Sequence, residues 1–219
     1  MFFVFAASCL VQPQESEPAY SFTRSQLIAT QTVATSRSEL LFIWDADKAK
    51  PWHVRIPKQT SRNPHPVFGF KGDAYRATDS TLKALTSFPD LEYVHLAYCC
   101  RISDDGIQHL AKLKSLRTLV LYRNHAKYGG NLLPISSSQA AKLPQRLTDN
   151  TLKHIASFRA LESLRIGDNQ FSEAAILGLA KCKTLKYLAI DESQMSDIGI
   201  TKLKRTLPDC EIDVWPGRR

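Results

Sequence analysis

The sequence lacks an apolar run long enough to cross a lipid bilayer. Its longest such run, Met1 to Val11, is interrupted only by Ser8 and falls well short of the roughly 20 residues that a spanning helix needs. The run is similar to the apolar core of a secretory signal, but no Lys or Arg precedes it. Two locations therefore remain open: an exported or periplasmic protein, and a cytoplasmic protein with an apolar N-terminus.

The chain also has few of the patterns that catalytic and metal sites require. Its five Cys are too few for a disulfide-dense scaffold, and none form the spaced pairs of a structural zinc site. Glycine-rich phosphate and dinucleotide motifs are absent, as is G-x-S-x-G. We therefore expect no enzyme activity, no cofactor and no metal. Two states remain open for Cys182 and Cys210: a disulfide in an exported protein, and buried free thiols.

What the sequence does contain is an ordinary globular composition. Apolar residues make up 43% and charged residues 23%, which excludes a disordered or collagen-like chain. The net charge of +8 favours acidic partners, yet most basic residues outside one insertion lie where helices are expected to end. Positive charge is favourable there, next to the negative end of the helix dipole. We therefore do not expect the chain to be a dedicated nucleic-acid binder, which would carry a basic stripe with interleaved aromatics.

A repeat begins near Ala77. A Ser or Thr followed by an acid recurs at intervals of 25, 45, 24 and 24 residues. Such a pair caps a helix N-terminus with its hydroxyl and complements the helix dipole with its acid. Apolar residues at helical spacing follow each pair, and an L-x-x-[LV]-x-[LI] strand pattern follows the first four helices. The five pairs are Thr78-Asp79, Ser103-Asp104, Thr148-Asp149, Ser172-Glu173 and Ser196-Asp197.

This pattern resembles the leucine-rich repeat family, in particular its cysteine-containing and bacterial types with a period of 24–25 residues. The polar turn position of the family pattern is occupied by Cys99, Asn124, Asn169 and Ser193. A small polar side chain at this position suits a turn, because it bonds the backbone inside the coil. The resemblance implies an α/β solenoid, a short right-handed arc with parallel strands on its concave side and helices on its convex side. It also implies a non-enzymatic protein–protein interaction module or scaffold.

Three segments are expected along the chain. Residues 1–20 form an apolar N-terminus and linker, residues 21–76 a non-repeat cap, and residues 77–219 five repeats, the last one degenerate. In the cap, the apolar runs 40–44 and 52–56 predict a β-hairpin that covers the open end of the solenoid. The segment 57–72, with three Pro and two Gly, predicts a loop.

The concave strand face is the candidate partner-binding site, because side chains between the buried leucines point away from the helices. Tyr and Arg often anchor protein interfaces, although tyrosine is also an ordinary strand former. We expect a protein partner and a monomeric chain. The predicted contact residues are Tyr93, His95, Tyr98, Tyr122, Arg123, Arg165, Asp168, Tyr187, Asp191 and Glu192.

Two alternative functions remain open. One is a substrate-recognition adaptor of the F-box type, since those proteins resemble this repeat subclass. Such an adaptor needs a helical segment before the repeats. Residues 21–76 show β-like runs and prolines instead. The other is an anionic-ligand or nucleic-acid binder that uses the insertion at about 122–146. This insertion contains no acid and carries Lys127, Lys142 and Arg146.

Overall fold

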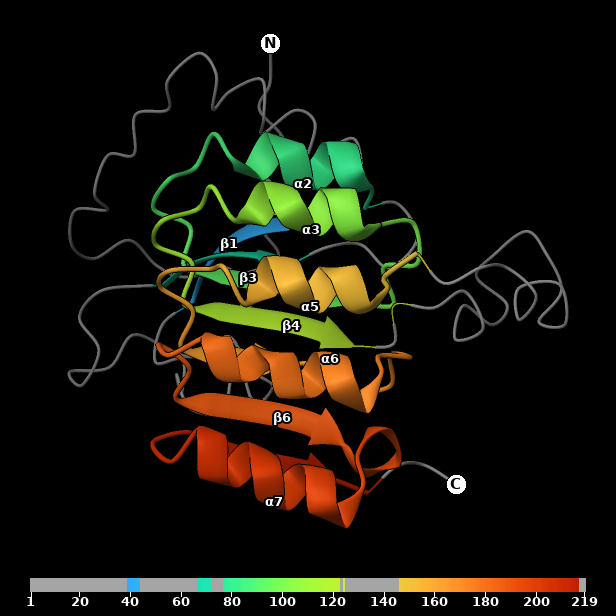
Figure 1. The fold of residues 1–219 in the computed structure, drawn as a ribbon. Helices are drawn as coiled ribbons and strands as arrows, with labels where there is room; N and C mark the ends of the chain where they lie inside the picture. Colours follow the sequence, from blue (N-terminus) through green and yellow to red (C-terminus); the bar gives the residue numbers. More distant parts are fainter. Residues whose placement is uncertain (1–38, 44–66, 72–76, 123, 125–145, 217–219) are drawn as a thin grey trace, which may run out of the picture.

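The computed structural model describes residues 39–43, 67–71, 77–122, 124 and 146–216, in which strands alternate with helices (Figure 1). The strands are β1 (Glu39–Ile43), β2 (Val67–Lys71), β3 (Tyr93–Ala97), β4 (Thr118–Tyr122), β5 (Ser163–Arg165), β6 (Tyr187–Asp191) and β7 (Glu211–Trp215). The α-helices are α2 (Asp79–Leu85), α3 (Asp104–Leu110), α5 (Asp149–Ile155), α6 (Glu173–Gly178) and α7 (Asp197–Thr206). Two 3₁₀ turns are η4 (Leu179–Lys181) and η5 (Glu192–Gln194).

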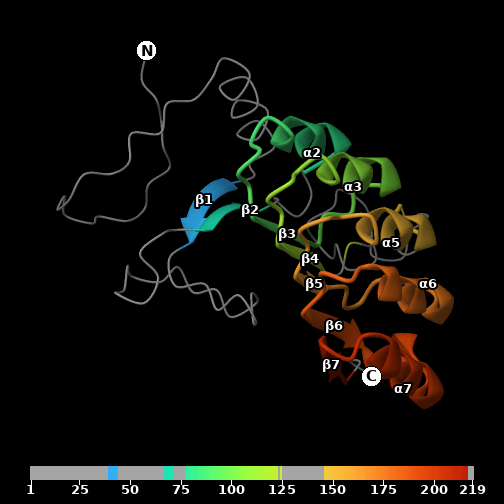
Figure 2. The same ribbon diagram turned by 60° about the vertical axis from the view of Figure 1, so that its left-hand side comes forward.

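The strands form one sheet in chain order. Strands β2 to β7 pair parallel with their neighbours, and β1 pairs antiparallel with β2 at the N-terminal edge. The helices stack side by side along one face of this sheet (Figure 2). The predicted α/β repeat solenoid is therefore confirmed. No helix among the described residues is long and apolar enough to span a membrane.

The N-terminal edge differs in part from the prediction. Strand β1 coincides with the first predicted strand, but its partner β2 lies in the segment 57–72, so the predicted loop is wrong at residues 67–71. Val67, Phe68 and Phe70 have strong β preference, and all three prolines of the segment precede residue 67 in the sequence. The predicted strand at 52–56 lies outside the described residues.

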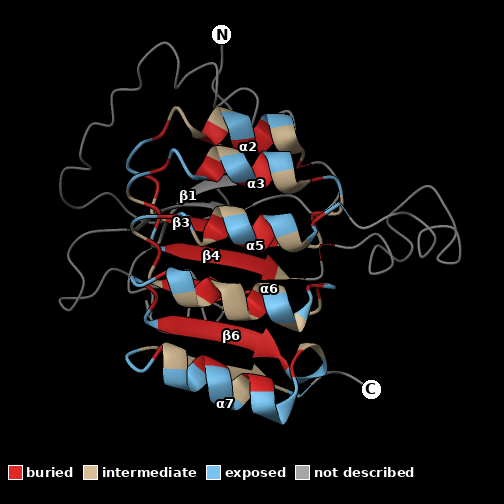
Figure 3. Ribbon diagram, viewed as in Figure 1, coloured by how far each residue is buried: buried red, intermediate tan, exposed pale blue. Residues whose placement is uncertain are grey.

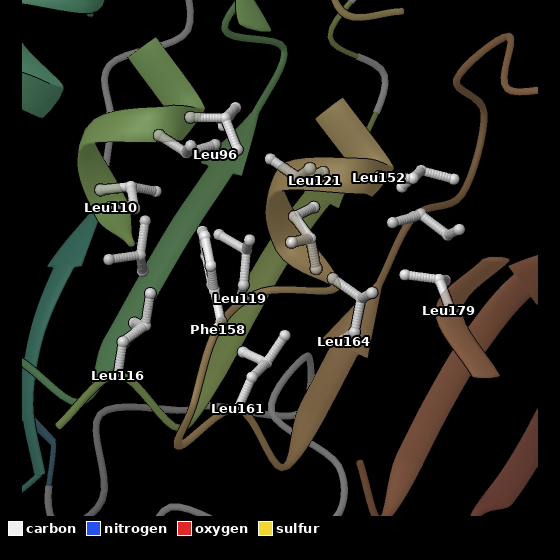
Figure 4. Close-up of a cluster of buried hydrophobic side chains, with 14 of the residues drawn as sticks. Leu96, Leu110, Leu116, Leu119, Leu121, Leu152, Phe158, Leu161, Leu164 and Leu179 are labelled. Carbon is white, nitrogen blue, oxygen red and sulfur yellow. The ribbon is translucent and has the colours of Figure 1, made fainter. Parts of the chain in front are cut away.

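The core lies between the sheet and the helices. Each repeat contributes strand residues such as Leu119, Leu121 and Leu164 and helix residues such as Leu152, all 0–1% exposed (Figure 4). Strands β3 to β6 are buried along most of their length, whereas helices expose their outward sides (Figure 3). A fully buried leucine contributes roughly 1.5–3 kcal/mol, so each stacked repeat stabilises the next.

The five predicted caps stand at the N-termini of α2, α3, α5, α6 and α7. The acid after each of the first four caps also binds the following repeat, a role that the sequence did not predict. Asp79 accepts hydrogen bonds from the Ser103 backbone N–H and hydroxyl, both at 2.7 Å. The same double contact joins Asp104 to Thr148, Asp149 to Ser172 and Glu173 to Ser196. These carboxylates therefore form a ladder of clamps between adjacent repeats.

Glycine leaves room for two of these clamps. A Cβ on Gly106 would lie 2.3 Å from Oδ1 of Asp79, and one on Gly199 would lie 2.4 Å from Oε1 of Glu173. At the same helix position α5 carries Thr151, whose hydroxyl donates to Asp104. The fourth clamp, between Asp149 and Ser172, has Ala175 at this position, so every clamp is accompanied there by a small residue or by one that bonds the clamp.

The Asp104→Asn substitution should weaken the solenoid at pH 7 but not in acid. Burial raises the pKa of Asp104, but hydrogen bonds from Thr148 and Thr151 outweigh burial and lower the pKa below its ordinary value. A lowered folded-state pKa gives stability that is present above the unfolded pKa of about 3.9 and is lost as pH falls through the folded pKa. We expect a cost of about 1 kcal/mol at pH 7, since Asn keeps one acceptor, and almost none at pH 2. Urea unfolding at both pH values measures this difference.

The exposed neighbour provides the control. Asp105→Asn removes the same charge from the same first helical turn without touching the clamp. An equal loss in both variants would indicate a general helix-dipole effect and contradict the clamp.

Candidate functional site

The concave face, defined here as the sheet face opposite the helices, presents side chains in rows set by the strand register. The first row is Tyr93, Thr118, Ser163, Tyr187 and Glu211. The second row is His95, Val120, Arg165, Ala189 and Asp213. Beyond these, Tyr122 stands beside Ala97 and Trp215 beside Asp191. In the first row the small Thr118 and Ser163 separate Tyr93 from Tyr187, and in the second row the small Ala189 stands next to Arg165.

Arg165 lies at the centre of an aromatic cluster. Its guanidinium carbon is 3.9 Å from the centroid of the Trp215 ring and 4.7 Å from that of Tyr122, so the cation lies over both rings. Arg165 is only 9% exposed. Burial lowers its pKa, while the nearby carboxyls of Asp168 and Asp213 raise it. The cluster therefore joins three strands through one largely buried cation.

Asp213 orders the two aromatic residues next to it. Its Oδ2 accepts hydrogen bonds from the Tyr187 hydroxyl at 2.8 Å and from Trp215 Nε1 at 2.6 Å. Burial and the Asp213 carboxylate raise the pKa of Tyr187 far above its ordinary value. Burial also raises the pKa of Tyr93 to about 12, against the opposing charge of Arg165. Both tyrosines thus remain protonated at physiological pH and act as hydroxyl-bearing rings.

Two residues at the carboxyl ends of strands adopt the left-handed backbone conformation. Tyr98 has φ 60° and Asp168 has φ 55°, and each stands 20 residues after its repeat's helix cap. This conformation costs roughly 1–2 kcal/mol for a residue with a Cβ. It places Tyr98 against Tyr122, with ring centroids 6.0 Å apart in an edge-to-face arrangement. The same turn in the later repeat holds Asp168 at the edge of the Arg165 cluster.

A pocket of about 180 Å³ opens in this C-terminal half of the concave face. Its walls include the Tyr122 and Trp215 rings, Arg165, and the carboxyl groups of Asp168 and Asp191. Gly167 also lines it, and a Cβ there would come within 3.2 Å of the Tyr122 ring. The pocket therefore combines aromatic surface with two acids and a buried arginine.

The structure brings only part of the predicted contact set together. Tyr122, Arg165, Asp168 and Asp191 meet at the pocket. Tyr98 packs on Tyr122, and His95 lies 6.2 Å from Tyr93, measured between ring centroids. Glu192 is exposed at the start of η5. The buried members of the set are Tyr93, Arg165, Tyr187 and Asp191, between 3% and 9% exposed. Tyr93, Arg165 and Tyr187 therefore offer little surface to a partner, and Asp191 is open to one only through the pocket that it lines.

The basic insertion is described only at its ends. Arg123, Lys127 and Lys142 lie outside the described residues, so the structure does not place them. Arg146 is exposed, and its Nη2 lies 3.6 Å from Oδ2 of Asp79. This residue therefore already contacts a carboxylate of the clamp ladder.

Two residues of the pocket and its cluster, Asp213 and Trp215, are absent from the sequence-based set, because they lie in the degenerate fifth repeat. A signal for them existed: they stand 24 residues after Ala189 and Asp191, one repeat period. Ile212 and Val214 alternate with them as core positions. The strand alternation of the degenerate fifth repeat would have predicted both.

The described residues include no group of three or more His, Cys, Asp or Glu side chains placed to hold a metal ion. Cys182 and Cys210 are free thiols, so of the two states left open the structure has the unpaired one. Burial, together with the neighbouring Cys182 and Glu211, raises the pKa of Cys210 to about 11. A thiol with so high a pKa is a poor nucleophile at neutral pH.

Comparison with known proteins finds a family model that matches one repeat and several matching solved structures. Residues 89–111 match the family model described as Leucine Rich repeat. No curated protein sequence matches the chain. Among solved structures, internalin C2 from Listeria monocytogenes matches with a TM-score of 0.35 and 14% sequence identity, over 93% of each chain. The matched segment spans β3 and α3, and the same cap, strand and turn recur in the repeats that follow. The chain thus resembles the leucine-rich repeat family at the matched repeat.

Proposed function

We propose that this chain is a non-enzymatic interaction module that binds a partner protein on its concave face. The observation that carries the proposal is the strip of partly buried aromatic rings formed by Tyr98, Tyr122 and Trp215, with Arg165 between the last two. Aromatic residues and arginine are enriched in the cores of protein interfaces and supply most of their binding energy. The match of residues 89–111 to the Leucine Rich repeat family model supports a protein partner in general terms.

The convex face is a weaker candidate. Among the described residues, Ile198 in α7 is the one large hydrophobic side chain that is exposed, at 81%. The equivalent position in the earlier repeats carries Ser80, Asp105, Asn150 and Ala174. A single exposed apolar residue is normal on a protein surface and forms no patch.

Burial divides the concave residues into two roles. Contact with the partner is assigned to the partly buried or exposed side chains His95, Tyr98, Tyr122, Asp168, Glu192 and Trp215. Arg165, Tyr187 and Asp213 instead hold the rings in place through stacking and hydrogen bonds. Rings that are fixed before binding lose less conformational entropy, which favours affinity.

Combined substitution of Tyr98→Ala and Tyr122→Ala should abolish partner binding while the protein stays folded. The two rings contact each other at the edge of the sheet, so their removal deletes interface area and leaves the core leucines in place. Loss of hot-spot residues of this kind commonly costs about 2 kcal/mol each, or more than 100-fold in affinity for the pair. Quantitative affinity capture from the native host, with a circular dichroism melt of each variant, measures both effects.

The convex face supplies the matched control. Ile198→Ser removes the exposed apolar residue of α7 and should leave the captured proteins unchanged. Capture that is lost with Ile198→Ser and kept with the double tyrosine variant would move the binding site to the helices and overturn the proposal.

A further inference from the structure

Asp191 is a buried carboxylate with an incomplete set of partners. It is 5% exposed and lines the concave pocket. Its Oδ1 accepts hydrogen bonds from the Ser193 backbone N–H at 2.9 Å and the Ser193 hydroxyl at 2.7 Å. Among the described residues, none donates a hydrogen bond to its Oδ2, and no Lys, Arg or His forms an ion pair with it. Buried charges in proteins are normally paired, so this oxygen is suited to an incoming donor.

Arg165 does not supply that donor. The carboxylates whose charge acts on its guanidinium are those of Asp168 and Asp213, and its flat faces are covered by Tyr122 and Trp215. Among the described residues, the pocket and its immediate surroundings hold three acids against one arginine, in a chain whose net charge is +8. The local excess of negative charge disfavours an anionic ligand and favours a cation.

The size of the pocket limits what it can hold. Its volume of about 180 Å³ is below the roughly 300–1,000 Å³ of pockets that enclose whole small molecules. A single long side chain fits better than a free metabolite. Aromatic walls suit the alkyl stem of a lysine or arginine, whose charged end then reaches a carboxylate.

From these observations we propose that the concave pocket receives one lysine or arginine side chain of the partner protein, with Asp191 as its carboxylate acceptor and Trp215 and Tyr122 as its walls. This inference rests on the proposed function, because it names the partner chemistry for the same face. Recognition of one basic residue would let the aromatic strip distinguish its partner protein from others.

Blocked tripeptides test the inference directly. The probes are acetylated, amidated Gly-Arg-Gly, its lysine analogue, the neutral isostere Gly-citrulline-Gly and Gly-Glu-Gly. Their binding to the full ¹⁵N-labelled chain is followed at the Trp215 indole N–H resonance, assigned by its loss in Trp215→Phe. We expect saturable shifts with the arginine or lysine peptide and at least tenfold weaker binding of the citrulline peptide. Asp191→Asn, which keeps the Oδ1 acceptor for Ser193, should weaken the basic peptides at least tenfold.

The control and the contrary outcomes are specific. Asp209→Asn removes one exposed acid just before β7 and should leave binding unchanged. Equal binding of the arginine and citrulline peptides, binding of the glutamate peptide alone, or no binding at all would each overturn the inference. The citrulline comparison needs no mutant, so it decides the question even if Asp191→Asn fails to fold. If the peptide experiment contradicts the inference but capture of a partner still depends on Tyr98 and Tyr122, the proposed function stands.

Discussion

Replacement of Asn169 by alanine should destabilise the solenoid by about 3–5 kcal/mol, because its buried amide serves several backbone groups that would lose their partners. Its Oδ1 accepts from the Asn124 backbone N–H at 3.1 Å. Its Nδ2 donates to the carbonyl oxygens of Leu121 at 2.9 Å and of Gly167 at 3.2 Å. The residue is 4% exposed, so water cannot replace these bonds. Urea unfolding at pH 7, monitored by circular dichroism, measures the loss.

Two other asparagines calibrate this result. Asn150 is exposed on α5 and its side chain accepts from Lys153, so Asn150→Ala should change stability by no more than about 0.5 kcal/mol. Asn124 is buried, but its Oδ1 binds only the Cys99 N–H and its Nδ2 has no partner. Asn124→Ala should therefore cost less than Asn169→Ala. An equal loss of stability at Asn124, Asn150 and Asn169 would show that the side-chain hydrogen bonds of the two buried asparagines do not stabilise the turns.

The turn asparagines also show why so much of this fold was predictable. In a solenoid each repeat packs only on its neighbours, so caps, helix stripes and strand alternation are local patterns that recur at one period. The sequence placed Asn124 and Asn169 at a turn where the side chain bonds the backbone inside the coil, and both do so. The cap residues follow the same logic, since the chemistry of a helix N-terminus is contained within four residues.

Interactions between repeats were harder to predict. The acid after each cap was assigned to its own helix dipole, whereas Asp79 and its equivalents bind the hydroxyl and N–H of the next cap, 23–44 residues away. Strand β2 was missed for a related reason. Its pairing with β1 and β3 lies outside the repeat pattern, and the flanking prolines and glycines suggested a loop.

The sequence predicted which side chains point to the concave face, but not which of them are buried. Strand alternation correctly pointed Tyr93, Arg165 and Tyr187 away from the helices. It could not show that small neighbours, Thr118 and Ser163, let these long side chains fold down onto the sheet and become buried. Contact of Arg165 with Tyr122 and Trp215 depends on rotamers and on strands 43–50 residues apart, which no local pattern contains.

Substitution of that arginine by glutamate should therefore act on folding rather than on a partner contact. Arg165→Glu would place a carboxylate against the negative faces of two aromatic rings and beside Asp168 and Asp213. An uncompensated buried charge costs about 3–5 kcal/mol. Arg165→Met keeps most of the side-chain volume without any charge, and Asp213 keeps its bonds from Tyr187 and Trp215, so its cost should be about 1–2 kcal/mol.

The pH dependence of stability separates the effect of charge from that of packing in the Arg165→Glu and Arg165→Met variants. The introduced carboxyl has a raised pKa in the folded state, because burial and neighbouring acids disfavour its charged form. Its destabilisation is therefore fully present above the folded pKa and fades as pH falls toward the unfolded pKa of about 4.3. Urea unfolding should show a gap between the glutamate and methionine variants at pH 7 that narrows steadily toward pH 4. A gap that does not change with pH would mean that shape alone disrupts the cluster, and the buried arginine would then serve as a spacer between the two rings rather than as a paired cation.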